Sequence, residues 1–318
     1  METKFLKADQ INQAVSLLKD GEIVAVPTET VYGLAADALN ENAIAKIFQA
    51  KNRPADHPLI LHIQSHSQIN DWAINISEDA KKLAQHFWPG PLTMILQKNN
   101  RVSSLITGGL DTVGLRVPDH PVALTLIKKL GNGIVAPSAN AHKKTSPTKP
   151  EHVLKTLDGK IAAIIDGGPC SVGIESTIID MTKPIPVIVR PGAITAKMIK
   201  AVINKTVKCP LKHSQKVSGN MEIHYQPDKP LLILSLDAIE KKLATERSVA
   251  IMHYSEIAHH KNATYYKMPQ NKNEYAKILY QTLYTIDTTD VDTILVEIPP
   301  TTIEWSDIND RLSKASWK

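Results

Sequence analysis

Residues 27–34 read Pro27-Thr28-Glu29-Thr30-Val31-Tyr32-Gly33-Leu34, and they follow a short apolar run at residues 23–26. The apolar, β-branched run is typical of a buried strand, and the hydroxyl-rich stretch after it predicts a turn. Loops at the ends of strands are where α/β proteins bind ligands. This stretch therefore predicts an α/β fold with a polar ligand site near the start of the chain.

Two cations and a histidine follow the same stretch. Residues 41–51 have helical apolar spacing, Asn40 stands in the N-cap position, and Lys51-Asn52-Arg53-Pro54 ends the helix. The next predicted strand, at residues 59–63, carries His62. Arginine offers a planar fork to phosphate oxygens and lysine a point charge, so the site suits a ligand with anionic and amine-bearing parts. Surface cations, a capped turn and a core histidine remain open alternatives.

Strand-like and helix-like segments alternate along the rest of the chain. We expect strands at residues 92–96, 113–117, 133–136, 161–165, 177–179 and 187–189, and helices at residues 11–18, 79–87, 121–130 and 195–203. A Lys-, Ser- and Pro-rich stretch interrupts the pattern. It then restarts with strands at residues 231–234, 249–252 and 293–296, and helices at residues 236–244, 273–286 and 307–315. This order predicts α/β domains over residues 1–206 and 231–318, joined by a linker over residues 207–230, with a sheet of mixed direction.

The composition agrees with a globular protein of two domains. The chain has 318 residues, of which 42% are hydrophobic and 22% charged. No apolar run is long enough to span a bilayer and the start lacks the apolar core of a signal peptide, so we expect a cytoplasmic protein without a membrane partner. Cys170 and Cys209 form neither a disulfide framework nor a zinc pattern. The net charge of +5 permits an anionic ligand or a nucleic acid and requires neither.

Later loops carry further groups suited to phosphate. Ser138-Ala139-Asn140 follows a predicted strand, where small residues let the backbone approach a ligand closely. Neither a Walker-type sequence nor Gly-x-Gly-x-x-Gly is present, which disfavours P-loop NTPases and standard dinucleotide sites. Arg116 lies in an apolar strand, where an unpaired charge is costly, so we expect it to have a partner, such as Glu29 or Asp111 in a salt bridge.

Taken in order, these segments resemble the YrdC/Sua5 family, the threonylcarbamoyl-adenylate synthases. Each segment is weakly specific by itself, but the ordered set is highly specific. The matching segments are residues 27–34, 51–54, 58–60, 88–93, 109–113 up to Arg116, 136–140, 146–148, 166–168, 173–177 and 190–192. The linker and second α/β domain are similar to the longer, two-domain members.

The resemblance implies an enzyme that joins L-threonine, bicarbonate and ATP into threonylcarbamoyl-AMP and releases pyrophosphate. The product serves the threonylcarbamoyladenosine modification of tRNA beside the anticodon. The resemblance also implies a twisted mixed sheet with a concave basic face, a smaller Rossmann-like domain, and a linker that reaches into the cavity as a lid. Mg2+ would accompany ATP, tRNA threonylcarbamoyl-transfer proteins would consume the product, and an RNA contact is a further option.

The resemblance also implies roles for individual residues. The positions that match threonine binding are Thr30, His62, Arg116, Ala136 and Ser176. The positions that match ATP binding are Lys51, Arg53, His57, Thr112, Ser138, Asn140, Ser146, Arg190 and Tyr225. We expect three of these to neutralise charge during the reaction, as catalytic residues: Lys51, Arg53 and Arg190. No protein metal ligand and no general base are assigned.

The chain departs from the family pattern in three places. His57 stands where the family more often has Asn, and residues 218–227 keep the His224-Tyr225 pair of the linker motif but not its Pro-Gly-Met entry. Residues 303–307 replace a Gly-rich segment. Two other functions share the fold: an RNA-binding module without catalysis, and carbamoyl transfer as in hydrogenase maturation. The intact cations favour the synthase over the first, and the lack of zinc-finger-like and acylphosphatase-like modules argues against the second.

Overall fold

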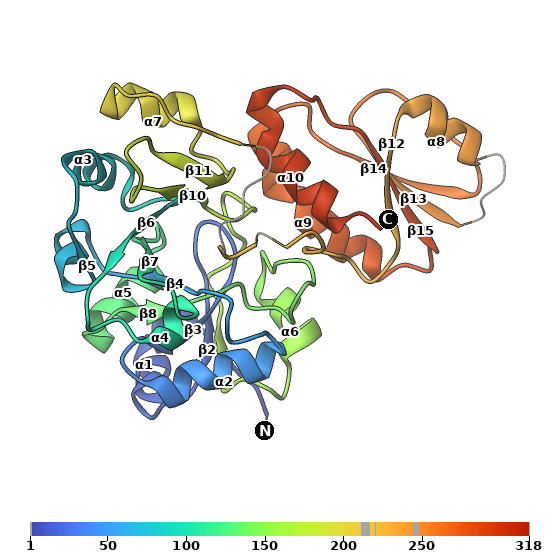
Figure 1. The fold of residues 1–318 in the computed structure, drawn as a ribbon. Helices are drawn as coiled ribbons and strands as arrows, with labels where there is room; N and C mark the ends of the chain where they lie inside the picture. The colour runs from blue at the N-terminus through green and yellow to red at the C-terminus, as the bar shows by residue number, and fades with distance from the viewer. Residues whose placement is uncertain (1, 211–216, 220, 244–247, 318) are drawn as a thin grey trace.

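The computed structural model describes residues 2–210, 217–219, 221–243 and 248–317 and contains two separate β-sheets (Figure 1). The large sheet has the order β1-β9-β2-β3-β8-β4-β7-β6-β10-β11, and β5 pairs with β6. It mixes parallel and antiparallel pairs. The small sheet, β12-β15-β13-β14, is parallel throughout. The expected α/β fold with a mixed sheet and a smaller α/β unit is confirmed.

The elements have the following bounds. The strands are β1 (Lys4–Leu6), β2 (Val24–Val26), β3 (Gly33–Asp37), β4 (Ile60–His62), β5 (Ala73–Ile74), β6 (Leu92–Lys98), β7 (Thr112–Arg116), β8 (Ile134–Val135), β9 (Ala163–Ile165), β10 (Thr177–Asp180), β11 (Val187–Arg190), β12 (Leu231–Leu234), β13 (Val249–His253), β14 (Ala263–Lys267) and β15 (Thr293–Glu297). The α-helices are α1 (Ile11–Lys19), α2 (Glu41–Lys51), α3 (Glu78–Phe87), α4 (Ser104–Thr107), α5 (Pro121–Leu130), α6 (Pro150–Leu157), α7 (Ala196–Ile203), α8 (Leu236–Leu243), α9 (Lys272–Asp287) and α10 (Ser306–Ala315). Short 3-10 helices are η1 (Ala8–Gln10), η2 (His66–Asp71) and η3 (Ile303–Trp305). Among the described residues, no helix has the length and apolar character needed to cross a membrane.

Several elements lie where the sequence pattern indicated none: β1, β3, β5, β14, α4 and α6. Strand β3 is the most consequential, because it continues directly from the Thr-rich turn. Its sequence, Gly-Leu-Ala-Ala-Asp, has low β-propensity, but antiparallel pairing with both β2 and β8 buries it. Tertiary pairing, rather than local preference, therefore makes this segment a strand.

Helices α9 and α10 lie between the two sheets (Figure 1). They pack on one face of the small sheet, and the same apolar cluster takes in Val31, Ile174 and Tyr225 from outside that sheet. Helix α8 covers the opposite face. The second unit therefore presents two helices, rather than a sheet edge, to the rest of the protein.

Local signals place the two cations at the end of α2. The Asn40 side chain accepts a hydrogen bond from the Ala43 amide at 3.1 Å, which confirms the expected N-cap. Asn52 adopts a left-handed conformation with φ 52°, and this ends the helix. Lys51 is consequently the last helical residue, and Arg53 follows the reversal of the chain.

The register of the large sheet brings two other predicted residues together. Strands β4 and β7 run parallel, and His62 is paired with Arg116. Both residues stand at the carboxyl ends of their strands, where ligand sites of α/β proteins form.

Candidate functional site

A cavity collects most of the residues that the sequence indicated. Its walls come from the turn before β3, the end of α2, the ends of β4 and β7, the loop after β8, the segment before β10, the end of β11, and the linker. The described lining residues that were predicted are Thr30, Lys51, Arg53, His62, Arg116, Ala136, Ser138, Asn140, Ser176, Arg190 and Tyr225. Side chains more than 190 positions apart in the sequence thus face one space.

Arg116 is held by carboxylate, hydroxyl and carbonyl oxygens. Its Nη2 lies 2.7 Å from Glu29 Oε2 and donates to Thr30 Oγ1 at 2.9 Å, while its Nε donates to the Gly90 carbonyl at 3.3 Å. Arg116 is only 4% exposed, so it needs such partners. Of the two acidic partners that the sequence suggested, Glu29 is the one that the structure pairs with Arg116.

His62 is buried beside Arg116, and its Nδ1 has no hydrogen-bond partner among the described residues. Burial and then the Arg116 charge lower the pKa of His62 to about 3. The ring is therefore neutral at physiological pH and suits hydrogen bonding to a ligand without adding charge.

Lys51 and Arg53 form a cationic wall of the same cavity. Lys51 Nζ donates to the carbonyls of Ser138 and Asn140, which fixes it under the loop after β8. Burial and then Arg53 lower the pKa of Lys51 well below its usual value. Arg53 Nη2 donates to the Pro58 carbonyl at 3.1 Å, and its buried Nε is unpartnered among the described residues. Because both side chains are buried, they are not ordinary solvated surface charges.

Arg190 and Ser176 line the cavity together with the Arg116–His62 pair and the cationic wall, and they are hydrogen-bonded to each other. Arg190 Nε donates to the Ser176 carbonyl and Nη2 to Ser176 Oγ, each at 3.0 Å. The Thr93 hydroxyl lies 2.7 Å from the same Ser176 oxygen. Arg190 Nη1 donates to the Ser218 carbonyl of the linker, also at 3.0 Å.

Four described residues of the linker line this cavity: Ser218, Gly219, His224 and Tyr225. Tyr225, 1% exposed, packs 4.0 Å from the His224 ring and 5.9 Å from the Tyr280 ring, measured between centroids. Gly219, with φ 82°, lies so close that a Cβ there would stand 2.3 Å from the Tyr225 hydroxyl oxygen. The remaining space is about 40 Å³, compared with the ~300–1,000 Å³ typical of ligand pockets. The described conformation is therefore closed.

Buried polar atoms without a hydrogen-bond partner concentrate here. Within the described residues, such atoms on the cavity lining are Arg53 Nε, His62 Nδ1, Asn140 Oδ1, both ring nitrogens of His142, His224 Nδ1 and the Tyr225 hydroxyl. Unpaired buried polar groups are uncommon in folded proteins and call for a physical reason. Their concentration at one cavity is the expected property of a site that binds a polar ligand.

Three of the predicted residues are not among the described lining of this cavity. Thr112 lines a neighbouring small pocket, and His57 packs its ring 5.6 Å from that of His142. Ser146 is buried and donates to Glu175 Oε1 at 2.5 Å. The Tyr32 hydroxyl, at the end of the hydroxyl-rich turn, donates to the Gly168 carbonyl at 2.8 Å, and Tyr32 is not part of the described lining either.

Similarity to known proteins covers nearly the whole chain. A family described as "Telomere recombination" (Sua5_yciO_yrdC) matches residues 16–192, and one described as "Threonylcarbamoyl-AMP synthase, C-terminal domain" matches residues 194–316. The Bacillus subtilis threonylcarbamoyl-AMP synthase is 43% identical, over 96% of this chain and 93% of its own. The Pyrococcus abyssi protein of the same name is 40% identical, over 91% and 88%.

The chain belongs to the Sua5 family of threonylcarbamoyl-AMP synthases.

A solved Sua5 structure has the same architecture. The P. abyssi Sua5 complexed with L-threonine superposes with a TM-score of 0.90 and 38% identity, covering 99% of this chain and 98% of that one. A HypF structure from T. kodakarensis, at 20% identity and a TM-score of 0.51, shares the fold alone. The two-domain Sua5 arrangement expected from the sequence is thus confirmed.

In this Sua5 chain, the second unit reaches the cavity through a buried ion pair that the sequence did not reveal. Arg311 of α10, 0% exposed, donates from Nε to Glu175 Oε2 at 2.7 Å. Its guanidinium carbon lies 5.3 Å from the centre of the Tyr225 ring. Lys314 Nζ donates to the Gly219 carbonyl at 2.9 Å. Helix α10 therefore supports the linker from behind.

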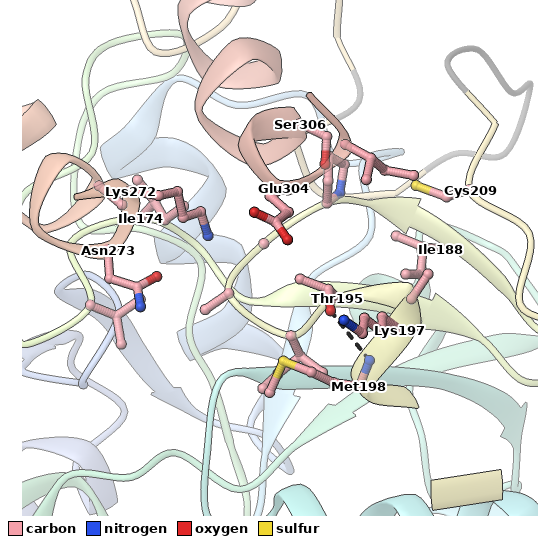
Figure 2. Close-up of a pocket in the computed structure, with 18 of the residues that line it drawn as sticks. Ile174, Ile188, Thr195, Lys197, Met198, Cys209, Lys272, Asn273, Glu304 and Ser306 are labelled. Atoms are coloured by element: carbon pink, nitrogen blue, oxygen red, sulfur yellow. Dashed lines mark hydrogen bonds between the residues drawn. The ribbon is translucent and has the colours of Figure 1, made fainter. Parts of the chain in front are cut away.

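A larger pocket, of about 690 Å³, lies between the end of β11 and α7 on one side and the start of α9 and η3 on the other. Figure 2 shows Lys197 and Met198 facing Lys272, Asn273 and Glu304 across it. None of the site residues predicted for this Sua5 protein is among its described lining. The smaller cavity, where the cations and unpaired polar atoms meet, is consequently the candidate active site.

Sequence reasoning missed His142, Glu175 and Arg311. His142 sits two residues beyond the Ser138-Ala139-Asn140 segment, so its position in the same loop was the available signal. Glu175 adjoins Ser176 within a segment already singled out. Arg311 comes from a helix far along the chain, and no local pattern links it to Glu175.

Proposed function

We propose that this protein condenses L-threonine, bicarbonate and ATP into threonylcarbamoyl-AMP, releasing pyrophosphate and water, for the modification of tRNA beside the anticodon. The observation that carries the proposal is the joining of two unlike half-sites in one cavity. One half offers a fixed guanidinium and a neutral imidazole, Arg116 and His62. The other offers Lys51 and Arg53, which line the same cavity.

The first half-site suits an amino acid. Arg116 would meet the threonine carboxylate through its positive charge and its Nη1, because its Nε and Nη2 already have partners in the described structure. Neutral His62 and the hydroxyls of Thr30 and Ser176 offer partners for the threonine hydroxyl and amine, and the Ala136 backbone lines the same end.

The second half-site suits a triphosphate. Lys51, Arg53 and Arg190 place three cationic groups around the position expected for the α-phosphate and the leaving pyrophosphate. Ser138, Asn140 and Tyr225 border the same space. The proposed ATP-binding set also keeps three residues that the described cavity lining does not include: His57, Thr112 and Ser146. In this proposal, a nucleotide reaches them when the linker moves.

The chemistry follows from this arrangement. The threonine amine attacks the bicarbonate carbon, and loss of water gives a carbamate. A carbamate oxygen then attacks the α-phosphorus, and the bond to the bridging oxygen of pyrophosphate breaks. The protein's contribution is to position the reactants and to neutralise negative charge that spreads over the phosphates, which is the work we assign to Lys51, Arg53 and Arg190.

Mg2+ fits this site as a companion of ATP rather than as a protein-held ion. In the described part of the chain, no group of three or more His, Cys, Asp or Glu side chains could hold a metal. The nearby carboxylates, Glu29 and Glu175, already pair with Arg116 and Arg311. Mg2+ commonly binds through substrate phosphates and water, and there it would offset phosphate charge.

The linker residues that line the cavity, Ser218, Gly219, His224 and Tyr225, have to move before ATP enters, since the closed cavity is far smaller than a nucleotide. In this proposal residues 1–206 carry the reaction and residues 231–318 support the closed linker. Delivery to tRNA threonylcarbamoyl-transfer proteins, any direct RNA contact and a cytoplasmic location belong to the same proposal.

The test is pyrophosphate release by the full-length protein with ATP, Mg2+, L-threonine and bicarbonate, with each substrate omitted in turn. We expect release that requires threonine and bicarbonate together. Release at the no-threonine level would reject the synthase. RNA binding by a protein without this activity would favour the binding-module alternative instead.

A further inference from the structure

His142 occupies a fixed position on the cationic wall. Its backbone amide donates to the Lys51 carbonyl at 2.8 Å, which ties the loop after β8 to the end of α2. Asn140 Nδ2 donates to the carbonyls of Ala141 and Lys144, each at 2.8 Å, and folds the same loop back on itself. The position of the His142 ring is therefore set by the backbone and by its neighbours rather than by a hydrogen bond of its own.

Neither ring nitrogen of His142 has a hydrogen-bond partner among the described residues, although both are shielded from solvent. A neutral imidazole carries one N–H donor and one acceptor, so both capacities are unmet. Leaving buried donors and acceptors unmet costs stability. Because His142 lines the cavity, a ligand in that cavity is the group that can meet them.

The groups that face His142 are either cationic side chains or imidazole rings. They come from the end of α2 and the loop after it (Lys51, Arg53 and His57), from its own loop (Lys143), and from the linker, where the His224 ring lies 6.3 Å away between centroids. Burial first, and then these charges, lower the pKa of His142 to about 4. The ring is thus neutral at physiological pH in the closed protein.

We propose that His142 is a phosphate-binding residue, which takes up a proton when the triphosphate of ATP enters the cavity and then donates hydrogen bonds to phosphate oxygens. This inference rests on the proposed function. A polyanion beside His142 offsets the positive charges that lower its pKa, because negative phosphates are added to a mainly cationic surrounding. The imidazolium then has two donors to offer where the free ring has one.

This role has a thermodynamic signature. The complex binds a proton that the free protein lacks, so the His142 contribution to ATP affinity must grow as the pH falls below the raised pKa of His142 in the complex, and must level off near pH 4, the pKa of the ring in the free protein. A variant without the ring nitrogens loses this part of the pH dependence of ATP affinity, while the part that comes from the titration of ATP itself is unchanged. A comparison of wild type with a His142 variant therefore isolates the contribution of the residue.

The experiment is isothermal titration calorimetry of the full-length protein with the Mg2+ complex of α,β-methylene-ATP, which cannot transfer at the α-phosphorus. Titrations in two buffers of different ionisation enthalpy at pH 6.5 give the protons taken up per ligand bound. We expect His142→Asn to take up fewer protons than wild type and to bind about tenfold more weakly, as befits a lost hydrogen bond to a charged group.

Two further variants complete the test. His142→Phe keeps a ring against His57 and His224 without nitrogens, and it should behave like His142→Asn. His86→Asn removes an exposed histidine from the end of α3 and should match wild type. Wild-type proton uptake and affinity in both His142 variants would overturn the inference while leaving the synthase intact. Failure of the wild type to bind the analogue would overturn both.

Discussion

Glu175 of the segment before β10 and Arg311 of α10 form a buried ion pair, with 2.7 Å between Glu175 Oε2 and Arg311 Nε. The Ser146 hydroxyl and the Tyr280 hydroxyl also donate to this carboxylate, at 2.5 and 3.1 Å. Glu175 adjoins Ser176, and Arg311 lies against Tyr225. The pair therefore links the second unit to both the proposed threonine half-site and the linker.

Removing Arg311 should destabilise the protein strongly. Arg311→Ala leaves the Glu175 charge buried without its main partner, and breaking such a pair typically costs about 3–5 kcal/mol. Urea denaturation measures the loss in free energy of unfolding. The matched control is the double variant Arg311→Met with Glu175→Gln, which buries no lone charge and should recover much of the loss. A single variant within 1 kcal/mol of wild type would contradict this account.

The same carboxylate predicts an acid-dependent loss of stability. Burial acts to raise the pKa of Glu175, but the charges of Arg311 and Arg190 and the hydrogen bonds from Ser146 and Arg311 outweigh it, and the pKa falls to about 2 from 4.5. A carboxyl group whose pKa is lowered by folding stabilises the folded protein fully at pH values above 4.5, its ordinary pKa. This contribution disappears as the pH falls through about 2, its pKa in the folded protein. The stability difference between wild type and Glu175→Gln should therefore be constant from pH 7 to pH 5 and shrink below about pH 4. A difference that stays constant down to pH 2.5 would count against the ionised pair.

Much of the site was predictable because its residues sit next to strand ends. The apolar runs indicated the strands that carry His62 and Arg116, and the pairing of these strands puts the two residues side by side. The capping residue Asn40 indicated the helix whose end places Lys51 and Arg53. Strand β3, with the sequence Gly-Leu-Ala-Ala-Asp, could not be predicted locally, because its pairing with β2 and β8 decides its conformation. The Glu175–Arg311 pair was equally hidden, since its partners are 136 positions apart.

Loss of either cation at the end of α2 should slow catalysis. Lys51→Ala and Arg53→Ala each remove charge that would stabilise the departing pyrophosphate, and we expect turnover to fall about 100-fold or more. Steady-state pyrophosphate release gives the rates. Lys46→Ala, on the same helix but paired with Glu22 at 2.7 Å near the surface, serves as the control and should retain wild-type turnover. Undiminished rates in Lys51→Ala and Arg53→Ala would show that these cations do not act on the phosphates.

The linker tyrosine should hold the nucleotide. Tyr225→Ala removes the ring between His224 and Tyr280, so we expect the dissociation rate of the ATP analogue to rise at least tenfold in stopped-flow displacement. Tyr225→Phe keeps the packing and loses only the hydroxyl, which has no hydrogen-bond partner within the described part of the chain, so this variant separates the two contributions. Equal dissociation from wild type and Tyr225→Ala would reject a closing role for this residue.

The most direct measurement is the mass of the adenylate formed from ATP, Mg2+, L-threonine and 13C-bicarbonate. The two half-sites predict a product that contains AMP, threonine and one 13C atom, formed only when all substrates are present. An unlabelled threonyl-AMP, or no adenylate at all, would contradict the assignment of the cavity to carbamate transfer onto the α-phosphate.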